Sequence, residues 1–206
     1  MPKVEEAYLE QRRDLILQAA LQCFARQGFR ETTIEDICRE AGVSRGALYW
    51  YFPSKEDIVQ ACAENNQQRI AYNFPLAKES DNAAVLFEEY VSRFIRHFDQ
   101  QEDPSKFPCQ VYLLAEALRN PQINRIVQWE WQQKNEFWEN LIQEGQRRGQ
   151  VSSAIDPTAM AQLLLAMAIG LSAQKALGAA VDAEKCVEAW KSLCSGSVQT
   201  SGLKVK

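Results

Sequence analysis

Several residue types are scarce in this chain of 206 residues, and each scarcity excludes a class of protein. His97 is the single histidine, so no second histidine is available for a zinc site or a catalytic triad. Nine glycines and seven prolines are few, and no run of alternating β-branched residues lies between turn signals. These scarcities predict an all-α protein. The sequence also contains no nucleophile–base pair and no phosphate-cradling glycine loop, so we expect a protein that is not an enzyme and needs no cofactor or metal.

The cysteines and the apolar stretches exclude further classes. Six cysteines include no Cys-x-x-Cys pair, which favours buried thiols, with a redox-sensing role for Cys109 as the alternative. Residues 1–6 contain no apolar segment of a signal peptide, which predicts a cytoplasmic protein. The unbroken apolar run at residues 163–171 is shorter than the roughly 20 residues that cross a bilayer, so we expect no membrane partner.

The chain also lacks the basic excess of many DNA-binding proteins. Its net charge is −4, and residues 1–60 carry 8 Lys and Arg against 10 Asp and Glu, a net of −2. Any DNA binding must therefore depend on where the charges lie. We expect a basic strip of Arg45 and Lys55, extended by Arg30 and Arg39, with the acidic groups facing away and a modest number of phosphate contacts.

What the chain does contain is a helix-turn-helix pattern at residues 32–52. Thr32 with Glu35 forms a predicted capping box for a first helix, and Gly42 is placed to end that helix in a left-handed conformation. Ser44 is the predicted N-cap of a second helix, which Pro53 ends. Two helices joined by such a turn are typical of proteins that lay the second helix in the DNA major groove, although the shape also occurs as plain helical packing.

The outward residues of the second helix suit DNA. Gly46 and Ala47 let its first turn approach base edges, and Arg45 can bond guanine O6 and N7. The three consecutive aromatics at 49–51 cannot all be buried, since successive helical positions lie about 100° apart. Leu48 and Phe52 share the inward face, and at least one aromatic must point outward.

This region resembles the DNA-binding signature of the tetracycline repressor (TetR) family. The resemblance rests on Thr-Thr-Ile-x-x-Ile from Thr32, on Ala-Gly-Val-Ser-Arg-Gly-Ala-Leu-Tyr-Trp-Tyr-Phe from Ala41, and on Pro-Ser-Lys-Glu-Asp from Pro53. It covers residues 9 to 60 without a gap. The rest of the chain is similar to the family only in its helical pattern.

The resemblance implies a dimeric, ligand-responsive transcription factor and assigns roles to single residues. Those where members hold the phosphate backbone are Thr33, Tyr49, Tyr51 and Lys55, and those where members meet the groove are Ser44, Arg45, Gly46, Ala47 and Trp50. Many members have Thr or Ser where this chain has Ala47. One hydroxyl contact is therefore absent, and the operator of a relative cannot be assumed.

The remaining pattern predicts helices at 9–27, 55–74, 83–99, 109–118, 121–148, 159–177 and 183–194, with loops at 75–82 and 100–108. Leu15 is expected on the buried face of the first helix, and Arg12 and Arg13 either reach phosphate or are merely solvated. We divide the chain into a helix-turn-helix domain at 9–69, a helical effector-binding and dimerisation domain at 70–194, and a flexible tail at 195–206.

Candidate effector contacts lie on three helices of the second domain. They are Phe94, His97, Tyr112, Glu116, Trp131 and Trp138. Clustered aromatics are typical of an apolar pocket or a subunit interface, and they also simply fill cores. His97 and Glu116 have the same two readings, as ligand contacts or as packed and solvated surface residues.

The helix at 159–177 is apolar nearly all round and therefore needs neighbours on every side. A second copy is expected over its small-residue face, in a four-helix interface with the preceding helix. The predicted dimer residues are Ala159, Leu163, Ala166, Gly170 and Ala173.

Together these features predict a homodimeric repressor that binds an inverted repeat in double-stranded DNA, with half-sites about 34 to 36 Å or a multiple of this apart. A small, largely apolar or aromatic effector would release it by tilting the connector helix at 55–74. The alternative is a transcriptional activator, or a ligand-independent DNA-binding dimer, on the same scaffold.

Overall fold

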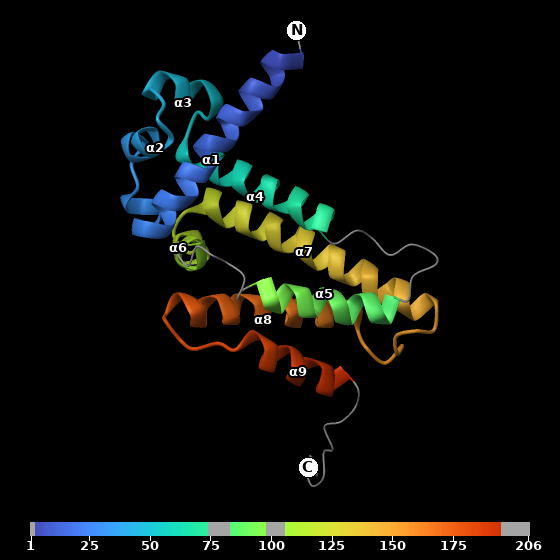
Figure 1. The fold of residues 1–206 in the computed structure, drawn as a ribbon. Helices are drawn as coiled ribbons and strands as arrows, with labels where there is room; N and C mark the ends of the chain where they lie inside the picture. Colours follow the sequence, from blue (N-terminus) through green and yellow to red (C-terminus); the bar gives the residue numbers. More distant parts are fainter. Residues whose placement is uncertain (1–2, 74–82, 98–105, 195–206) are drawn as a thin grey trace.

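The chain folds into α-helices joined by turns and short irregular segments in the residues that the computed structural model describes, which are 3–73, 83–97 and 106–194 (Figure 1). The helices are α1 (Lys3–Glu31), α2 (Ile34–Ala41), α3 (Arg45–Tyr51), α4 (Lys55–Asn73), α5 (Ala83–His97), α6 (Lys106–Ala117), α7 (Pro121–Arg147), α8 (Pro157–Ala176) and α9 (Ala183–Cys194). The predicted all-α fold is confirmed. The tail at 195–206, the loop at 75–82 and most of the loop at 100–108 lie outside the described residues.

Two predicted helix boundaries were wrong. The first helix begins at Lys3 instead of at residue 9. Its predicted stop at Gly28 is confirmed, because the backbone breaks there with φ 82° and ψ 166°, and a short helical segment to Glu31 follows. Helix α6 begins at Lys106, so Pro108 lies in its first turn instead of in a loop. A proline is tolerated there because the first backbone N–H groups of a helix have no intrahelical acceptor.

The first hydrophobic core joins α1, α2 and α3 and extends to α4 and to the start of α7. Ile16, Phe24, Ile37 and Leu48 are fully buried in it. Leu15, expected on the same face, is 42% exposed instead. The buried face of α1 includes Ile16, Leu17, Ala20 and Phe24 and is centred near Ala20, and Leu15 lies about 140° around the helix from that centre.

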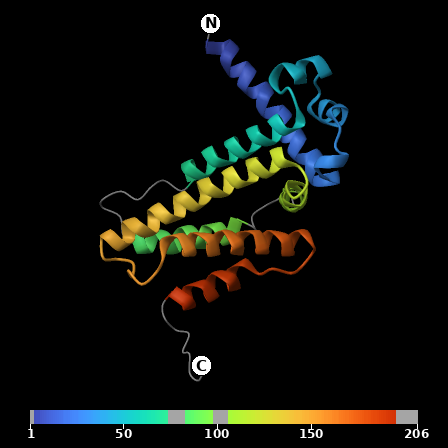
Figure 2. The same ribbon diagram turned by 180° about the vertical axis from the view of Figure 1, so that it is seen from behind.

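Helices α4 and α7 run side by side in both views and connect the upper unit to the lower one (Figures 1 and 2). Helix α6 lies beside the C-terminal end of α1 and packs against it. The unit of α1, α2 and α3 is therefore supported by α6, which packs on α1, and by α7, which contributes to the first core.

The second core lies among α5, α7, α8 and α9, where Tyr90, Trp138, Leu164 and Val187 are buried. Helix α8 lies behind α5 in Figure 1 and in front of it in Figure 2, so one side of α8 forms the outer surface. By length and composition alone α8 could cross a membrane. This is weak evidence, because core helices of soluble proteins pass the same test, and α8 packs here against α7 and α6.

Candidate nucleic-acid interface

Helix α2 is capped one residue later than the sequence predicted. Thr33 is the N-cap: its hydroxyl accepts from Asp36 N at 3.1 Å, and the Asp36 carboxylate accepts from Thr33 N at 3.0 Å. The Thr33 hydroxyl also donates to the Asp36 carboxylate at 2.7 Å, and this bond, together with the one from Thr33 N, holds the pKa of Asp36 well below its ordinary value. Thr32 is instead fully buried and donates its hydroxyl to Gly28 O at 2.7 Å. The predicted Thr32–Glu35 capping box is therefore wrong, and Glu35 takes no part in capping α2.

The turn between α2 and α3 forms as predicted. Gly42 takes φ 64° and ψ 35°, the left-handed conformation that ends a helix, and Val43 N donates to Cys38 O at 3.0 Å. Ser44 is the N-cap of α3, since its hydroxyl accepts from Ala47 N at 3.2 Å. This turn fixes the direction in which α3 leaves α2.

Helix α3 presents its outer face as predicted. Leu48 and Phe52 are buried, whereas Trp50 is 68% exposed and Tyr49 40% exposed. Tyr51 is half-buried and packs against the first core. The first turn of α3, residues 45–47, is exposed, and a Cβ added to Gly46 would meet no described atom within 4 Å.

The arginines of this face are paired with acids, which the sequence did not predict. Arg45 Nη1 lies 2.6 Å from Glu35 Oε1, and its guanidinium lies 5.6 Å from the centre of the Tyr49 ring. A hydrogen bond with Tyr49 and the charge of Glu35 raise the pKa of Arg45. Arg39 is paired with Asp36. The expectation that acidic groups face away from the basic strip is wrong, because both acids lie on α2 beside the arginines they pair with.

Lys55 is engaged by the protein itself. Its ammonium donates to Phe29 O at 2.8 Å and Thr32 O at 2.6 Å and lies 4.5 Å from the centre of the Phe29 ring. Burial lowers the pKa of Lys55. These bonds tie the start of α4 to the end of α1, while Arg30, expected in the same strip, is exposed.

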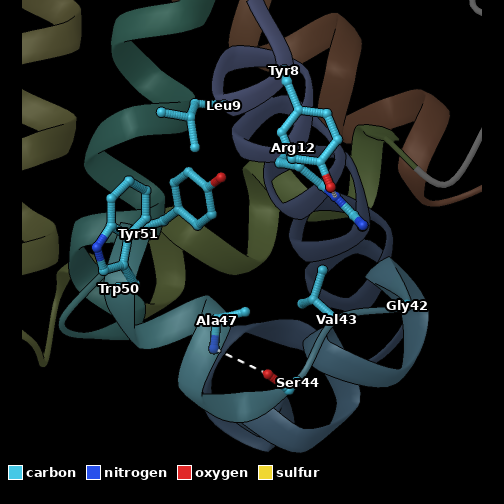
Figure 3. A pocket seen from close by; sticks show the side chains of 9 residues that line it. All are labelled: Tyr8, Leu9, Arg12, Gly42, Val43, Ser44, Ala47, Trp50 and Tyr51. Carbon is cyan, nitrogen blue, oxygen red and sulfur yellow. Dashed lines mark hydrogen bonds between the residues drawn. The ribbon is translucent and has the colours of Figure 1, made fainter. Parts of the chain in front are cut away.

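A groove of about 420 Å³ lies between the N-terminal half of α1 and helix α3 (Figure 3). Ser44, Ala47 and Trp50 line it from α3 and its cap, and Tyr8 and Arg12 line it from α1. Arg12 Nε donates to the Tyr8 hydroxyl at 3.1 Å. Arg13 lies over the Phe52 ring instead, at 5.5 Å. The groove thus lies beside the exposed face of α3, with one arginine at its edge.

Two sequence profiles of known families match this chain. The profile described as "Bacterial regulatory proteins, tetR family" matches residues 16–62, which contain α2, α3, about half of α1 and the start of α4. The profile "BetI-type transcriptional repressor, C-terminal" matches residues 73–196, more than half of the chain. The chain belongs to the tetR family. It is a DNA-binding transcriptional regulator of a non-enzymatic family, and it binds DNA through its helix-turn-helix.

Relatives of this tetR-family regulator cover most of its length. The HTH-type transcriptional regulator UidR of Escherichia coli is 29% identical over 162 residues, 78% of this chain and 80% of UidR. The structure of GusR of Salmonella enterica is 28% identical, with a TM-score of 0.73 over 90% of this chain and 94% of GusR. FadR of Bacillus subtilis in complex with stearoyl-CoA has a TM-score of 0.72 over 88% and 97% of the two chains. At 18% identity this shows the fold alone.

The structure separates the candidate effector residues of the regulator into different places. The Tyr112 ring lies 3.6 Å from where a Cβ on Gly28 of α1 would stand. Glu116 is half-buried and near enough to Lys55 to act on its pKa. Tyr112 and Glu116 therefore face the DNA-binding unit. Phe94 and His97 lie on α5 and Cys109 lies on α6. The side chains of these three residues are outside the part of the chain that the structure describes.

The two tryptophans belong to different cores of the regulator. Trp131 packs on the first core, whereas Trp138 is buried in the second beside Phe137, which stacks on Tyr90 at 6.2 Å. On the same two helices, α5 and α7, sequence reasoning missed two residues: Ser92 Oγ and Asn135 Oδ1 are buried and have no hydrogen-bond partner among the described residues. A serine within the apolar stripe of α5 was the one available signal. Burial of Cys23 and Cys38 raises the pKa of both thiols, as expected of structural cysteines.

The predicted dimer stripe of the regulator lies on the outer side of α8. Ala159, Leu163 and Ala166 are exposed, Leu163 by 64%, and Gly170 and Ala173 are partly exposed. The opposite side, with Ala161, Leu164, Ala168 and Ser172, is buried. The preceding helix does not share this property. Exposed positions on α7 are polar apart from Pro121, as at Gln128, Gln132, Glu136 and Asn140.

Proposed function

We propose that this regulator is a homodimeric repressor that reads an inverted repeat with α3 and is released by a small, largely apolar or aromatic effector. The observation that carries the proposal is the exposed outer face of α3, with Arg45, Tyr49 and Trp50 projecting from it. A transcription regulator acts where the DNA is, so we place it in the cytoplasm.

In the proposed complex the first turn of α3 lies in the major groove. Arg45 reads guanine and Trp50 packs beside it, while Ser44, Gly46 and Ala47 allow the close approach. Thr33, Tyr49 and Tyr51 hold phosphates. For Lys55 we propose a phosphate contact only if DNA replaces a carbonyl partner, since an ammonium has three donors and the carbonyls of Phe29, Arg30 and Thr32 already accept from them.

Dimerisation would bring the exposed stripe of α8 against its copy. Small residues at Ala159, Ala166 and Gly170 permit close packing of two helices, and Leu163 provides apolar area to bury. In the proposed dimer interface, the helix that accompanies α8 is α9 and not α7. Helix α9 has exposed apolar groups at Leu193 and Ala189, whereas the outer side of α7 is polar.

The effector would bind between α5 and α7. The aromatic wall of Tyr90, Phe137 and Trp138 suits an apolar ligand. The buried oxygens of Ser92 and Asn135, which have no partner within the part of the chain that the structure describes, suit a hydrogen-bond donor on such a ligand. FadR with its stearoyl-CoA is a protein of the same fold whose ligand carries a long apolar acyl chain on a polar coenzyme A group.

Binding there would reach the DNA-reading unit through two contacts. Asn120 at the start of α7 donates to Glu56 of α4 at 3.1 Å, and Tyr112 of α6 packs on Gly28 of α1. A ligand moves these contacts only if it binds the released arrangement more tightly than the DNA-bound one.

Footprinting on DNA around the regulator's own gene tests the proposal. We expect protection of an inverted repeat that a screened apolar or aromatic compound abolishes, and lower transcription from that promoter in vitro when the protein is present. Protection of no inverted repeat under any ligand condition would contradict the proposal. Protection with raised transcription would instead favour the activator.

A further inference from the structure

The ion pair between Glu35 and Arg45 connects two helices at the surface that faces DNA. Glu35 lies in the first turn of α2 and Arg45 in the first turn of α3, with 2.6 Å between Oε1 and Nη1. Their side chains are 56% and 64% exposed. The pair is not needed to hold α2 against α3, because the buried side chains of Ile37 and Leu48 do that. An exposed ion pair stabilises a fold little.

Glu35 limits the orientation of the guanidinium that would read a base. The carboxylate lies on one side of Arg45 and the Tyr49 ring lies on another, 5.6 Å away. A guanidinium has five N–H donors, so Glu35 can keep one while two others bond guanine O6 and N7. The side chain is thus already oriented before DNA binds.

The same carboxylate opposes binding to the wrong sequence. It cancels the charge of Arg45 and is itself repelled by phosphate, so a complex made of phosphate contacts alone gains little from this pair. Only a base that accepts from two of the remaining N–H groups of the guanidinium offsets that repulsion. This explains why a DNA-reading unit of net charge −2 keeps an acid at its reading face.

We propose that Glu35 is a specificity-determining positioning residue, which orients Arg45 toward a G·C pair and weakens binding to DNA that lacks this pair in register. The inference rests on the proposed contact between Arg45 and a base. It assigns a role to a residue of α2 that the helix-turn-helix pattern alone gives only to helix capping.

Binding measurements on the full chain test the role. The native protein first selects a duplex from a random double-stranded pool, and a shuffled duplex of the same composition serves as non-specific DNA. Affinities for both are measured by fluorescence anisotropy for the native protein, Glu35→Gln, Arg45→Ala and the double variant. Glu40→Gln is the matched control, because Glu40 forms an exposed ion pair with Arg26 at 3.3 Å and none with α3 among the described residues. Melting temperatures confirm that each variant folds.

We expect Glu35→Gln to bind the shuffled duplex about threefold to tenfold more tightly while its preference for the selected duplex falls by a similar factor. Glu35→Gln should lose its sequence preference at the same G·C pair at which Arg45→Ala loses its preference. In the Arg45→Ala background, Glu35→Gln should cause no further loss of preference. Glu40→Gln should change both affinities by the same small factor.

An unchanged preference in Glu35→Gln, or an equal loss in Glu40→Gln, would overturn the inference and leave the proposed function standing. If the native protein enriches no sequence at all, the proposed function fails and the inference fails with it.

Discussion

At the scale of single residues, two glycines in the helix-turn-helix have opposite uses. Gly42 has φ 64°, a conformation that side chains with a Cβ rarely take, whereas Gly46 has ordinary helical geometry and open space around it. One glycine therefore serves the backbone, and the other serves whatever approaches α3.

Gly42→Ala should lower the free energy of unfolding by about 1 kcal/mol, because alanine is strained in the left-handed conformation. Gly46→Ala should leave it unchanged or raise it by about 0.5 kcal/mol, since alanine favours a helix. Urea denaturation measures both. The added methyl at position 46 should nevertheless weaken binding to the selected duplex, and retained affinity there would contradict a close approach by DNA.

The Asp36 carboxylate predicts a pH dependence of stability. Its hydrogen bonds with Thr33 lower its pKa from an ordinary value of 3.8, so the folded state is stabilised by the ionised form above that value. This stabilisation is lost as the pH falls toward the lowered pKa. The native protein should therefore melt above Asp36→Asn at neutral pH, and the gap should narrow as the pH falls below about 4. A gap that is constant between neutral pH and about pH 3 would contradict the assignment.

The capping error shows what a sequence pattern cannot resolve at this scale. Thr32 and Thr33 are adjacent, and both have an acid three residues later, Glu35 or Asp36. The choice depends on which threonine faces α1, where Thr32 donates to Gly28 O. That contact is tertiary, and no local spacing determines it.

At the scale of the elements, Asn120 connects α7 to α4. Its side chain accepts from Gln122 N and Ile123 N at the start of α7 and donates to Glu56 on α4. One side chain thus caps one helix and holds the end of another.

Replacing Asn120 separates these two tasks. Asn120→Ala should lower the free energy of unfolding by about 1 kcal/mol through loss of the cap. Asn120→Asp keeps a capping oxygen but loses the donor to Glu56 and places two carboxylates together, so it should change the effector concentration that releases DNA more than it changes stability. Urea denaturation and a release titration measure the two effects. Native behaviour of Asn120→Asp in the titration would exclude this contact from the route between the two domains.

Helical periodicity and capping residues predicted the elements well, because these signals are local. Helix α9 was predicted at its observed bounds and α4 within one residue. The effector residues could not be predicted in the same way. Tyr112 is an aromatic residue of the kind that often lines pockets, but only the packing of α6 on α1 determines that its ring lies over Gly28.

At the scale of the whole molecule, the exposed stripe of α8 predicts that DNA affinity depends on the oligomeric state. Leu163→Glu would place two carboxylates at the proposed two-fold interface and should give monomers in sedimentation velocity, with operator binding weakened by a factor of about 100 or more. Leu118→Glu is the control, because Leu118 is 85% exposed and lies outside the stripe. If the Leu163→Glu protein stays dimeric, the proposed interface at α8 is contradicted and the dimer must form through another surface.

The most direct test of a dimeric reader combines selection of DNA with stoichiometry. The native chain is used to enrich a random duplex pool, and the enriched duplex is then sedimented with the protein. Our account predicts an inverted repeat with half-sites about 34 to 36 Å or a multiple of this apart, bound by two chains or a multiple of two. A single unrepeated motif bound by one chain would contradict it.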